Sequence, residues 1–535
     1  MSPTTTDPLT DLRAAIASAA SALGNAATAQ LKLERPPRAD LGDYSSNAAM
    51  LLAPGLGKPP RDVAGQLGAS VGDMLGDAVE RVDVAGPGFL NLFMTEAWFR
   101  RAVAGMAEAG ESFGAGRADP AERTLVEFVS ANPTGPITVA SGRHAAYGDS
   151  LARILEFAGH AVEREFYVND TGTQVLRFGE SIRARARGEE PPEDGYKGEY
   201  VAELAKRISA AADKDPAELA QTGVKLMLAE IAATLGRFRV HMDRFFSERS
   251  VWESGKVEKS LELLEEHGHV YSSDGATWLR TTTFGDDKDR VLRRSTGDLT
   301  YFASDIGYHE DKRERGYDRL INVLGADHHG YMARMHAVWQ ALGDDPERFE
   351  IIIMQLVNLS EGGQRAQMSK RQGEFVSLDD LIDDIGVDVA RYFLLERSHD
   401  TTLDLDLTLA RDQSEKNPVY YVQYAHARIA SILRRADAEP DAQSAAGESL
   451  HPSEKTLIKK LLEFPTEIDI AVERRAPHRL TTYAHELAQD FSAFYRDCKV
   501  VGTPEEPFRL ALCVQTKRVI AKSLELLGVS APEEM

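Results

Sequence analysis

Apolar residues follow different periods in successive parts of this 535-residue chain. Near the start, Leu12, Ile16 and Leu23 recur at helical spacing, which predicts an amphipathic helix. Residues 82–93 instead hold two short apolar runs around a Gly-Pro-Gly turn, as a pair of strands would. We therefore predict a compact α+β module over residues 1–115.

The central part of the chain alternates short apolar runs with helical stretches. Runs that are apolar on both faces are typical of a parallel sheet covered by helices, so we predict an α/β domain over residues 116–400. A charged, mainly helical stretch at about 175–285 predicts an insertion between the two halves of this sheet. The expected strands are residues 125–129, 163–168, 320–324 and 350–356.

The last part, residues 401–535, has helical periodicity. Leu457, Leu461 and Phe464 share one predicted helical face. We therefore predict an all-α domain here. A chain of this length is also too long for one hydrophobic core, which agrees with a division into three domains.

Composition narrows the class of protein. Hydrophobic residues make up 43% and charged residues 27%, which is ordinary for a globular protein. No apolar run reaches eighteen residues and residues 1–12 lack a secretory signal, so we expect no membrane span. With two cysteines, Cys498 and Cys513, we expect reduced thiols and a cytoplasmic protein. The overall net charge of −22 argues against nucleic-acid binding, but a local basic face would be enough to bind phosphates.

Chemistry-bearing residues gather where the first predicted strand of the sheet ends. Glu127 interrupts an apolar strand and Asn132 follows it, and ligands of open parallel sheets bind at the carboxyl ends of strands. A buried carboxylate needs a cation or donors, so a cationic substrate group would suit Glu127; an edge or solvent-facing position is the alternative. The turn at residues 133–136 leads into a helix near residues 139–142, whose free N–H groups would favour phosphate.

A second candidate segment lies far along the chain. Residues 367–371 read Gln-Met-Ser-Lys-Arg after a Glu-Gly-Gly turn, which places Lys370 on a loop. A loop lysine could meet phosphate charge that develops in a transition state, although a solvated basic turn is the simpler explanation. Asp327 and His328 stand beside His329, but no third type of ligand clusters near them, so we expect no metal site.

Together these segments resemble the class I aminoacyl-tRNA synthetases, and the arginyl-tRNA synthetases in particular, over essentially the whole chain. Seven family segments occur here in the family's order, at residues 126–136, 167–174, 300–309, 322–331, 391–398, 417–428 and 527–535. The first reads V-E-F-V-S-A-N-P-T-G-P and the sixth N-P-V-Y-Y-V-Q-Y-A-H-A-R. The resemblance implies a Rossmann-type class I core with an N-terminal α+β module for the tRNA elbow and a C-terminal all-α anticodon-binding domain.

The resemblance also implies a substrate site. Arginine would be held by Glu127, Asn132, Tyr301 and Asp305, and the last two share a helical face because they are four residues apart. Carboxylates are suitable partners for a guanidinium group. The family's catalytic positions are Thr138, Ser141 and Lys370 here. ATP, with Mg²⁺, would lie between them and would also contact Ala140, Gly142, Asp327, His328, Met368 and Ser369.

A tRNA that accepts arginine is the implied partner. In the N-terminal module the candidate contacts are Tyr44, Asn47 and Phe89. In the helical domain they are Tyr421, Gln423, Tyr424 and Arg428, because aromatic faces and a cation can hold unstacked bases. Several of these tyrosines could instead be interhelical core.

Two family signatures are altered in this chain. The H-x-G-H loop has become Thr138-Val139-Ala140-Ser141, and K-M-S-K has become Q-M-S-K at residues 367–370. Both imidazoles that would contact ATP phosphates are lost, and we expect His144 to lie too far round the helix to replace them. Each lost hydrogen bond to transition-state charge costs roughly 3–4 kcal/mol. We therefore predict that ATP-dependent activation of arginine is severely weakened.

Three functions stay open at this point. The chain could be an atypical ligase that uses ATP and Mg²⁺. It could be a paralogue that transfers or cyclises an arginyl group in specialised metabolism, or a non-catalytic protein that binds tRNA or arginine; neither of these would need a cofactor. We expect a monomer in each case.

Overall fold

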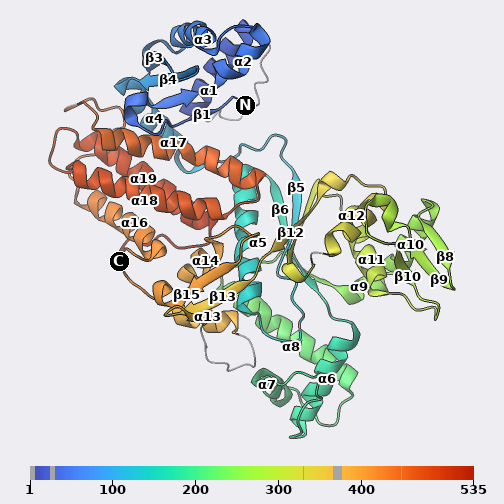
Figure 1. The fold of residues 1–535 in the computed structure, drawn as a ribbon. Coiled ribbons are helices and arrows are strands. Elements are labelled where there is room, and N and C mark those ends of the chain that lie inside the picture. The colour runs from blue at the N-terminus through green and yellow to red at the C-terminus, as the bar shows by residue number, and fades with distance from the viewer. Residues whose placement is uncertain (1–6, 25–30, 329, 366–375, 448) are drawn as a thin grey trace.

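The computed structural model describes residues 7–24, 31–328, 330–365, 376–447 and 449–535. Figure 1 shows an N-terminal unit, a central domain built on a parallel sheet and a helical C-terminal domain. Helix α5 (Val139–Ala158) lies between the sheet and the helical domain and contacts both.

The N-terminal unit is an antiparallel sheet with helices packed against it. Its strand order is β1-β2-β4-β3, and β3 and β4 form the hairpin that the sequence predicts. The bounds are α1 (Pro8–Leu23), β1 (Leu33–Glu34), β2 (Tyr44–Ser46), α2 (Ala48–Leu56), α3 (Pro60–Leu75), β3 (Val79–Ala85), β4 (Phe89–Met94) and α4 (Glu96–Ala109).

The central sheet is parallel and has the strand order β12-β11-β5-β6-β7. All four strands predicted from apolar runs are confirmed. The bounds are β5 (Arg123–Glu127), β6 (Ala161–Val168), β7 (Arg244–Ser247), α11 (Tyr301–Glu314), β11 (Arg319–Gly325), α12 (Tyr331–Ala341) and β12 (Phe349–Met354). In this register Asn322 of β11 pairs with Glu127 of β5, so the strand ends that carry candidate site residues are neighbours.

The expected insertion at 175–285 is not one block, because β7 lies inside it and is the fifth strand of the sheet. This short edge strand reads Arg-Phe-Phe-Ser, so no apolar run marks it. Helices precede it, and a small antiparallel sheet of order β10-β9-β8 follows. The bounds are α6 (Gly172–Ala186), α7 (Glu199–Arg207), α8 (Pro216–Arg237), α9 (Glu248–Glu253), α10 (Lys256–Glu266), β8 (Val270–Ser273), β9 (Ala276–Leu279) and β10 (Arg290–Arg293).

Strand pairing also crosses the boundary expected at residue 400. β15 (Leu403–Asp406) pairs in parallel with β13 (Val357–Glu361), so the central domain extends past that residue. The remaining bounds are β14 (Gln364–Arg365), α13 (Leu378–Ile385), α14 (Val387–Leu395), α15 (Leu407–Ala410), α16 (Pro418–Arg435), α17 (Pro452–Glu473), α18 (His478–Asp497) and α19 (Glu506–Leu526).

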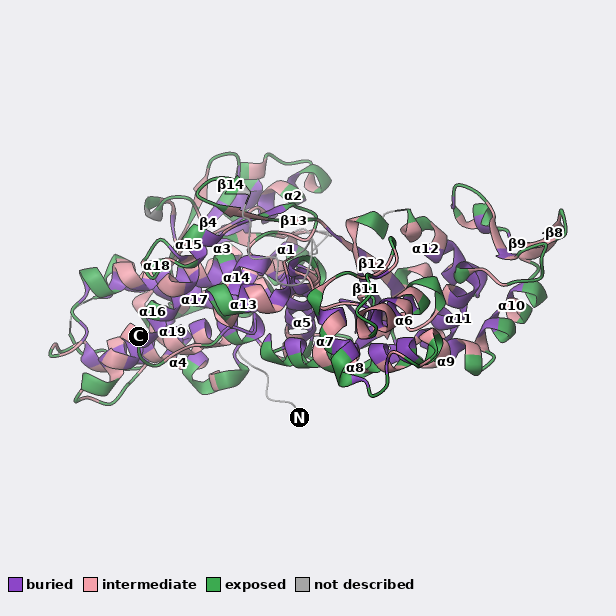
Figure 2. Ribbon diagram, turned by 90° about the horizontal axis from the view of Figure 1, so that it is seen from below, coloured by how far each residue is buried: buried purple, intermediate pink, exposed green. Residues whose placement is uncertain are grey.

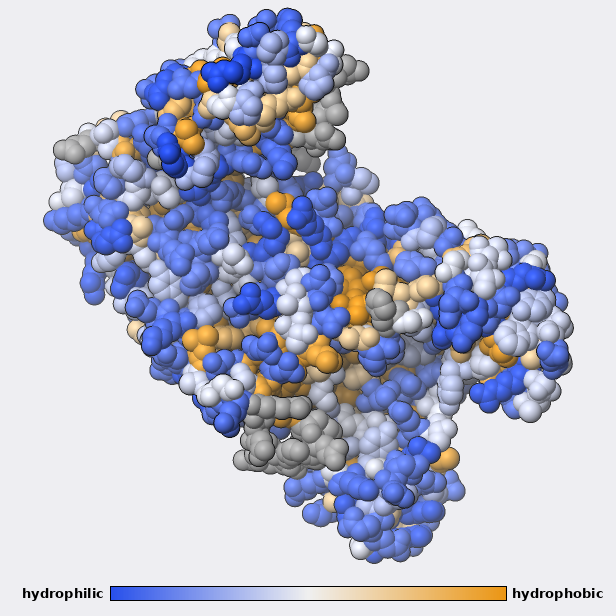
Figure 3. Space-filling model, in the orientation of Figure 1, coloured by the Kyte–Doolittle hydropathy of each residue, from blue (hydrophilic) through white to orange (hydrophobic). Residues whose placement is uncertain are grey.

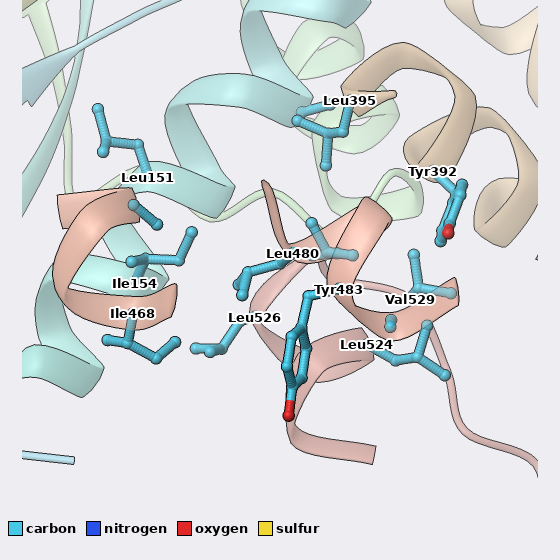
Figure 4. Close-up of a cluster of buried hydrophobic side chains, with 14 of the residues drawn as sticks. Leu151, Ile154, Tyr392, Leu395, Ile468, Leu480, Tyr483, Leu524, Leu526 and Val529 are labelled. Atoms are coloured by element: carbon cyan, nitrogen blue, oxygen red, sulfur yellow. The ribbon is translucent and has the colours of Figure 1, made fainter. Parts of the chain in front are cut away.

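The helical domain and α5 share one hydrophobic core. Figure 4 shows Leu151 and Ile154 of α5 beside Ile468 of α17, with Leu480 and Leu524 from the next helices nearby. Each of these five side chains is fully buried. Figure 2 shows the same concentration of buried residues around α5 and α14, whereas the β8–β9 hairpin is more open. This core holds α5 in place, and with it the loop at its start.

Candidate functional site

A cavity of about 840 Å³ opens at the carboxyl ends of β5, β6 and β11. This is the edge at which open α/β sheets bind their ligands. On the face of the molecule that Figure 3 shows, the largest apolar area lies in the middle, over the central domain. The cavity brings together predicted residues from distant parts of the chain, namely Glu127, Asn132, Ser141, Tyr301, Asp305, Asp327 and His328.

The backbone is strained where β5 ends at this cavity. Val129 and Ser130 have φ angles of 69° and 40°, a left-handed region that β-branched residues in particular avoid. Such conformations cost about 1–3 kcal/mol each and persist where the surroundings hold them. Here Ser130 Oγ donates to Glu127 Oε1 at 2.9 Å and accepts from the Tyr167 N–H at 3.2 Å. The strained turn therefore directs a hydroxyl at the buried carboxylate.

The cation that pairs with Glu127 is a lysine of the same chain. The fully buried Lys312 of α11 forms an ion pair with Glu127 and donates to Asn322 Oδ1 at 2.8 Å. The Tyr308 hydroxyl donates to Glu127 Oε2 at 3.0 Å. Burial raises the pKa of Glu127, but the Lys312 ammonium outweighs it, so the net pKa lies below its ordinary value. A cationic substrate is therefore not needed to neutralise Glu127, and the sequence analysis did not anticipate Lys312 as its partner.

Asp305 has no such ion pair among the described residues. It lies half-buried in the cavity wall, and the nearby Tyr331 hydroxyl lowers its pKa. Burial raises the pKa of Asp305 to about 7, and the carboxylate of Glu248 adds to the rise. A cation bound in the cavity would lower this pKa again, because it favours the ionised form. Asp305 is therefore the carboxylate that a cationic ligand would meet.

The other two candidates for arginine are more open. Tyr301 begins α11 and is 62% exposed. Asn132 Nδ2 donates to Gln174 Oε1 at 3.0 Å. Both line the cavity with Asp305, so a ligand there can contact all three.

The start of α5 has fewer free donors than the sequence predicts. Thr138 is the N-cap residue, and its Oγ1 accepts from the Ser141 N–H at 3.2 Å. The Gly142 N–H donates to Thr138 O at 2.8 Å, and the Val139 N–H donates to Val376 O at 3.2 Å. Of the first four N–H groups, only that of Ala140 donates to no described residue. The start of α5 therefore offers fewer free N–H groups than expected, and phosphate binding there stays a prediction.

The residues of this loop have different environments. The Ser141 side chain lines the cavity, and its hydroxyl lies 3.2 Å from Thr138 Oγ1. Ala140 is exposed and outside the lining. Gly142 is buried, and a Cβ at this position would lie 2.7 Å from Leu378 Cδ1. The structure therefore gives Gly142 a packing role against α13, in place of the predicted nucleotide contact.

The loop at the start of α5 is bonded to the residues that precede α13. Besides the bond from Val139 to Val376, the Leu378 N–H donates to Ile137 O at 2.7 Å, and Thr138 and Ser377 form an isolated antiparallel bridge. The predicted nucleotide residues Met368, Ser369 and Lys370 lie outside the described residues. Residues 376–378 are thus fixed directly beside residues 137–139.

His144 lies nearer to the cavity than expected. It lines the cavity together with Ser141, since residues three apart share a helical face. Burial lowers its pKa to about 4, so the ring is neutral near pH 7. Asp327 and His328 also line the cavity, and their side chains lie 3.5 Å apart. In the part of the chain that the structure describes, no cluster of three or more His, Cys, Asp or Glu residues could hold a metal ion.

The N-terminal candidates for tRNA contact divide into buried and accessible residues. Tyr44 is buried and packs edge-on against Trp98, with their ring centroids 5.8 Å apart, so it belongs to the core of the N-terminal unit. Asn47 Oδ1 accepts from the Lys32 N–H at 2.9 Å. Phe89 is 37% exposed beside the Gly-Pro-Gly turn, so it is the accessible aromatic residue of the three.

The candidates in the helical domain divide in the same way. Gln423 is buried and donates to Asp388 and to Ser530 O, and the Tyr421 hydroxyl donates to Ser492 Oγ at 3.0 Å. These two residues therefore join parts of the fold, as the core alternative predicts. Tyr424 and Arg428 instead line a cleft of about 1020 Å³. The same cleft is lined by Arg434, Arg435, Tyr495, Arg496 and Lys499, and also by Glu533 and Glu534, so basic residues outnumber acidic ones there.

Comparison with known proteins identifies the family. The arginine–tRNA ligase of Frankia alni is 48% identical over 522 residues, which cover 94% of each chain. The chain belongs to the arginyl-tRNA synthetase family. Three family models match it: the arginyl tRNA synthetase N terminal domain at residues 10–94, the catalytic domain of class I (R) tRNA synthetases at 197–430, and the DALR anticodon binding domain at 422–535.

Solved structures agree with the synthetase fold. Arginyl-tRNA synthetase from Thermus thermophilus is 25% identical, with a TM-score of 0.78 over 98% of this chain and 99% of its own. The enzyme from Plasmodium falciparum, at 16% identity, shares the fold with a TM-score of 0.74 over 98% of each chain. The class I core, the N-terminal module and the C-terminal helical domain expected from the resemblance are thus confirmed. No helix of the described residues is long and apolar enough to cross a bilayer.

Proposed function

We propose that this chain is an ATP-dependent arginine–tRNA ligase. The observation that carries the proposal is the cavity, where Asp305, a carboxylate without an ion pair among the described residues, lies with Tyr301 and Asn132 beside Ser141. A guanidinium group is planar, always charged and a donor on two edges, so it suits a carboxylate flanked by amide and hydroxyl groups.

Arginine would enter with its cationic groups toward Asp305. Asn132 would offer its amide oxygen and Tyr301 its hydroxyl or ring. Glu127 keeps its partner Lys312, so its part is to shape the wall and accept a further hydrogen bond. Because Lys312 neutralises Glu127, Asp305 is the carboxylate that would favour a cationic substrate over neutral amino acids.

ATP would lie in the cavity beside the start of α5. Ser141, His144, Asp327 and His328 line that side of the cavity. Lys370, Met368 and Ser369 stay proposed contacts of the nucleotide. Mg²⁺ would arrive with the phosphates and keep several of its waters, as it does in such sites. Hydroxyls replace the family's imidazoles here, so we propose that activation is slower than in relatives that keep H-x-G-H.

The tRNA would extend from the N-terminal module to the helical domain. The basic cleft with Tyr424, Tyr495 and Arg428 supports a contact with unstacked bases, since Arg428 lies 4.5 Å from the Tyr424 ring centroid. A monomer in the cytoplasm stays our prediction for the working form.

Two assays test the proposal on one preparation. The first measures exchange of labelled pyrophosphate into ATP with arginine, with and without tRNA. The second measures loss of arginine from pre-charged arginyl-tRNA. Exchange that depends on arginine supports the ligase. No exchange, with rapid turnover of the charged tRNA, would contradict it in favour of a redirected enzyme.

A further inference from the structure

We propose that Arg334 binds the acidic end of the amino-acid substrate, which is the α-carboxylate of arginine or the phosphate joined to it once arginine is activated. The inference rests on the proposed function, because it assumes that the cavity takes arginine. It adds a substrate-positioning residue that neither the motifs nor the comparisons point to.

Arg334 is a cation without a partner in a cavity chosen for a cationic ligand. It lies on α12 and is the only lysine or arginine among the described residues that line the cavity. None of its guanidinium nitrogens makes a hydrogen bond or ion pair with a described residue, and its Nε is buried. Buried donors are nearly always satisfied in folded proteins, so the unpaired Nε and the free terminal nitrogens of Arg334 are available to a ligand that accepts hydrogen bonds.

The surroundings of Arg334 hold it in position without using its donors. Its guanidinium carbon lies 5.7 Å from the centroid of the Phe302 ring, whose contact leaves the N–H edges free. Tyr331, three residues earlier, shares this face of α12, and its hydroxyl acts on Asp305 by lowering the pKa of that carboxyl. The first turn of α12 therefore presents Arg334 on the same side as the hydroxyl that contacts Asp305.

Asp305 and Arg334 form a pair of opposite charges that fits a zwitterion. Both line the cavity, and the positive charge of Arg334 acts on Asp305 by lowering its pKa against the larger effect of burial. Arginine carries a guanidinium, an ammonium and a carboxylate. Asp305 can bind one cationic group while the planar fork of Arg334 binds the acidic group, with two parallel hydrogen bonds to either a carboxylate or a phosphate.

The consequence is discrimination against ligands that lack the acidic group. Agmatine is arginine without its carboxylate, so it keeps the contacts with Asp305 but offers nothing to Arg334. The wild-type protein should bind arginine more tightly than agmatine. Charge-assisted hydrogen bonds support a difference of roughly ten- to hundredfold in dissociation constant.

The test is calorimetric titration of the full-length protein at pH 8.5 with three ligands: L-arginine, agmatine and a non-hydrolysable sulfamoyl analogue of arginyl-adenylate. The variants are Arg334→Met, which keeps the stem against Phe302, and Arg334→Lys, which keeps the charge but loses the fork. Arg293→Met removes a guanidinium from β10, outside the cavity, and is the matched control. Near-UV circular dichroism checks that each variant is folded.

We expect Arg334→Met to weaken arginine binding about ten- to hundredfold, to leave agmatine unchanged and to abolish the preference between them. Arg334→Lys should recover part of the loss, and Arg293→Met should match the wild type. A loss confined to the sulfamoyl analogue would assign Arg334 to the phosphate. The inference would be overturned if the wild type bound all three ligands with equal affinity, or if Arg334→Met lost affinity equally for arginine and agmatine. If the wild type binds neither arginine nor agmatine, the proposed function itself fails.

Discussion

The backbone N–H of Leu378 donates to the carbonyl oxygen of Ile137 at 2.7 Å, which joins two segments more than two hundred residues apart in the chain. Ile137 precedes the N-cap of α5, and Leu378 begins α13. Leu378 also fills the space that a side chain at Gly142 would need. The two elements that flank the nucleotide side of the cavity are therefore held in one arrangement by both backbone and packing.

The close approach of α5 to β5 predicts the effect of Gly148→Ala. A Cβ at Gly148 would lie 2.2 Å from Cγ of Phe128, a fully buried ring that follows β5. We expect the variant to lower the free energy of unfolding by about 1–3 kcal/mol, as overpacked cores do. Gly65→Ala in α3 is the control, because its Cβ would meet nothing within 4 Å. That change should stabilise by about 0.5–1 kcal/mol. Urea unfolding of both variants measures the contrast, and equal shifts would refute it.

The Glu127–Lys312 pair predicts a strong effect of Lys312→Met. Removing the ammonium leaves Glu127 buried and charged, which costs roughly 3–5 kcal/mol in other proteins. The double variant Glu127→Gln/Lys312→Met should be more stable than Lys312→Met alone, because it removes the uncompensated charge. A double variant that is less stable than the single variant would show that the ion pair does not explain the burial of Lys312. Urea unfolding at pH 7.5 measures both.

The raised pKa of Asp305 predicts a pH-dependent affinity for arginine. Below pH 7 this carboxyl is mostly protonated, so it binds a cation poorly; above pH 7 it is ionised. Affinity should therefore rise with pH from 6 to 8, by up to about tenfold per unit below the pKa. Asp305→Asn should bind weakly with a flat profile. Calorimetry across this range tests the slope, and an unchanged slope in Asp305→Asn would assign it to another group.

The same pKa has a consequence for stability. Since the folded state raises the pKa of Asp305 from its ordinary 3.8 to about 7, the folded protein binds more protons than the unfolded chain between these values. This carboxyl therefore lowers the free energy of unfolding as pH rises from 3.8 to about 7. Asp305→Asn should remove that part of the pH dependence. A slope that is the same in both proteins would contradict the shifted pKa.

The altered loop predicts that an imidazole would restore catalytic power. We expect Ala140→Gly/Ser141→His to speed pyrophosphate exchange by roughly tenfold or more, because a hydrogen bond to developing charge is regained. Thr138 is kept in this variant, since its hydroxyl caps α5 and a lost cap costs about 1 kcal/mol. Ser141→Ala is the control and should be slower than the wild type. Equal rates in all three would mean that Ser141 does not face the transferred phosphate.

Much of the fold could be predicted from sequence, because local patterns determine it. The four apolar strands and the β3–β4 hairpin follow from the periodicity of side chains and the Gly-Pro-Gly turn. β7 was not predicted because this four-residue edge strand has no apolar run to mark it. The parallel pairing of β15 with β13 was not predicted because it depends on contacts between residues far apart in the chain.

The site was predictable only in part. Motif spacing placed Tyr301 and Asp305 on one helical face, and both line the cavity. It could not show that Lys312, within the charged run of residues 310–315, is fully buried as the partner of Glu127. It also could not show that Tyr44 is core or that Arg334 lacks a partner. Burial and pairing depend on which elements meet in space, and a single charged residue looks the same in sequence whether it faces solvent or a cavity.

The central claim is that this cavity selects arginine through Asp305 and that the chain joins it to tRNA. The most direct measurement is ATP-dependent formation of labelled arginyl-tRNA by the wild type and by Asp305→Asn. We predict that the wild type charges the tRNA and that the folded variant is slower by about a hundredfold or more, as expected when a charge-assisted contact to the substrate is lost. No charged tRNA from the folded wild type, or equal rates from the two proteins, would contradict the account.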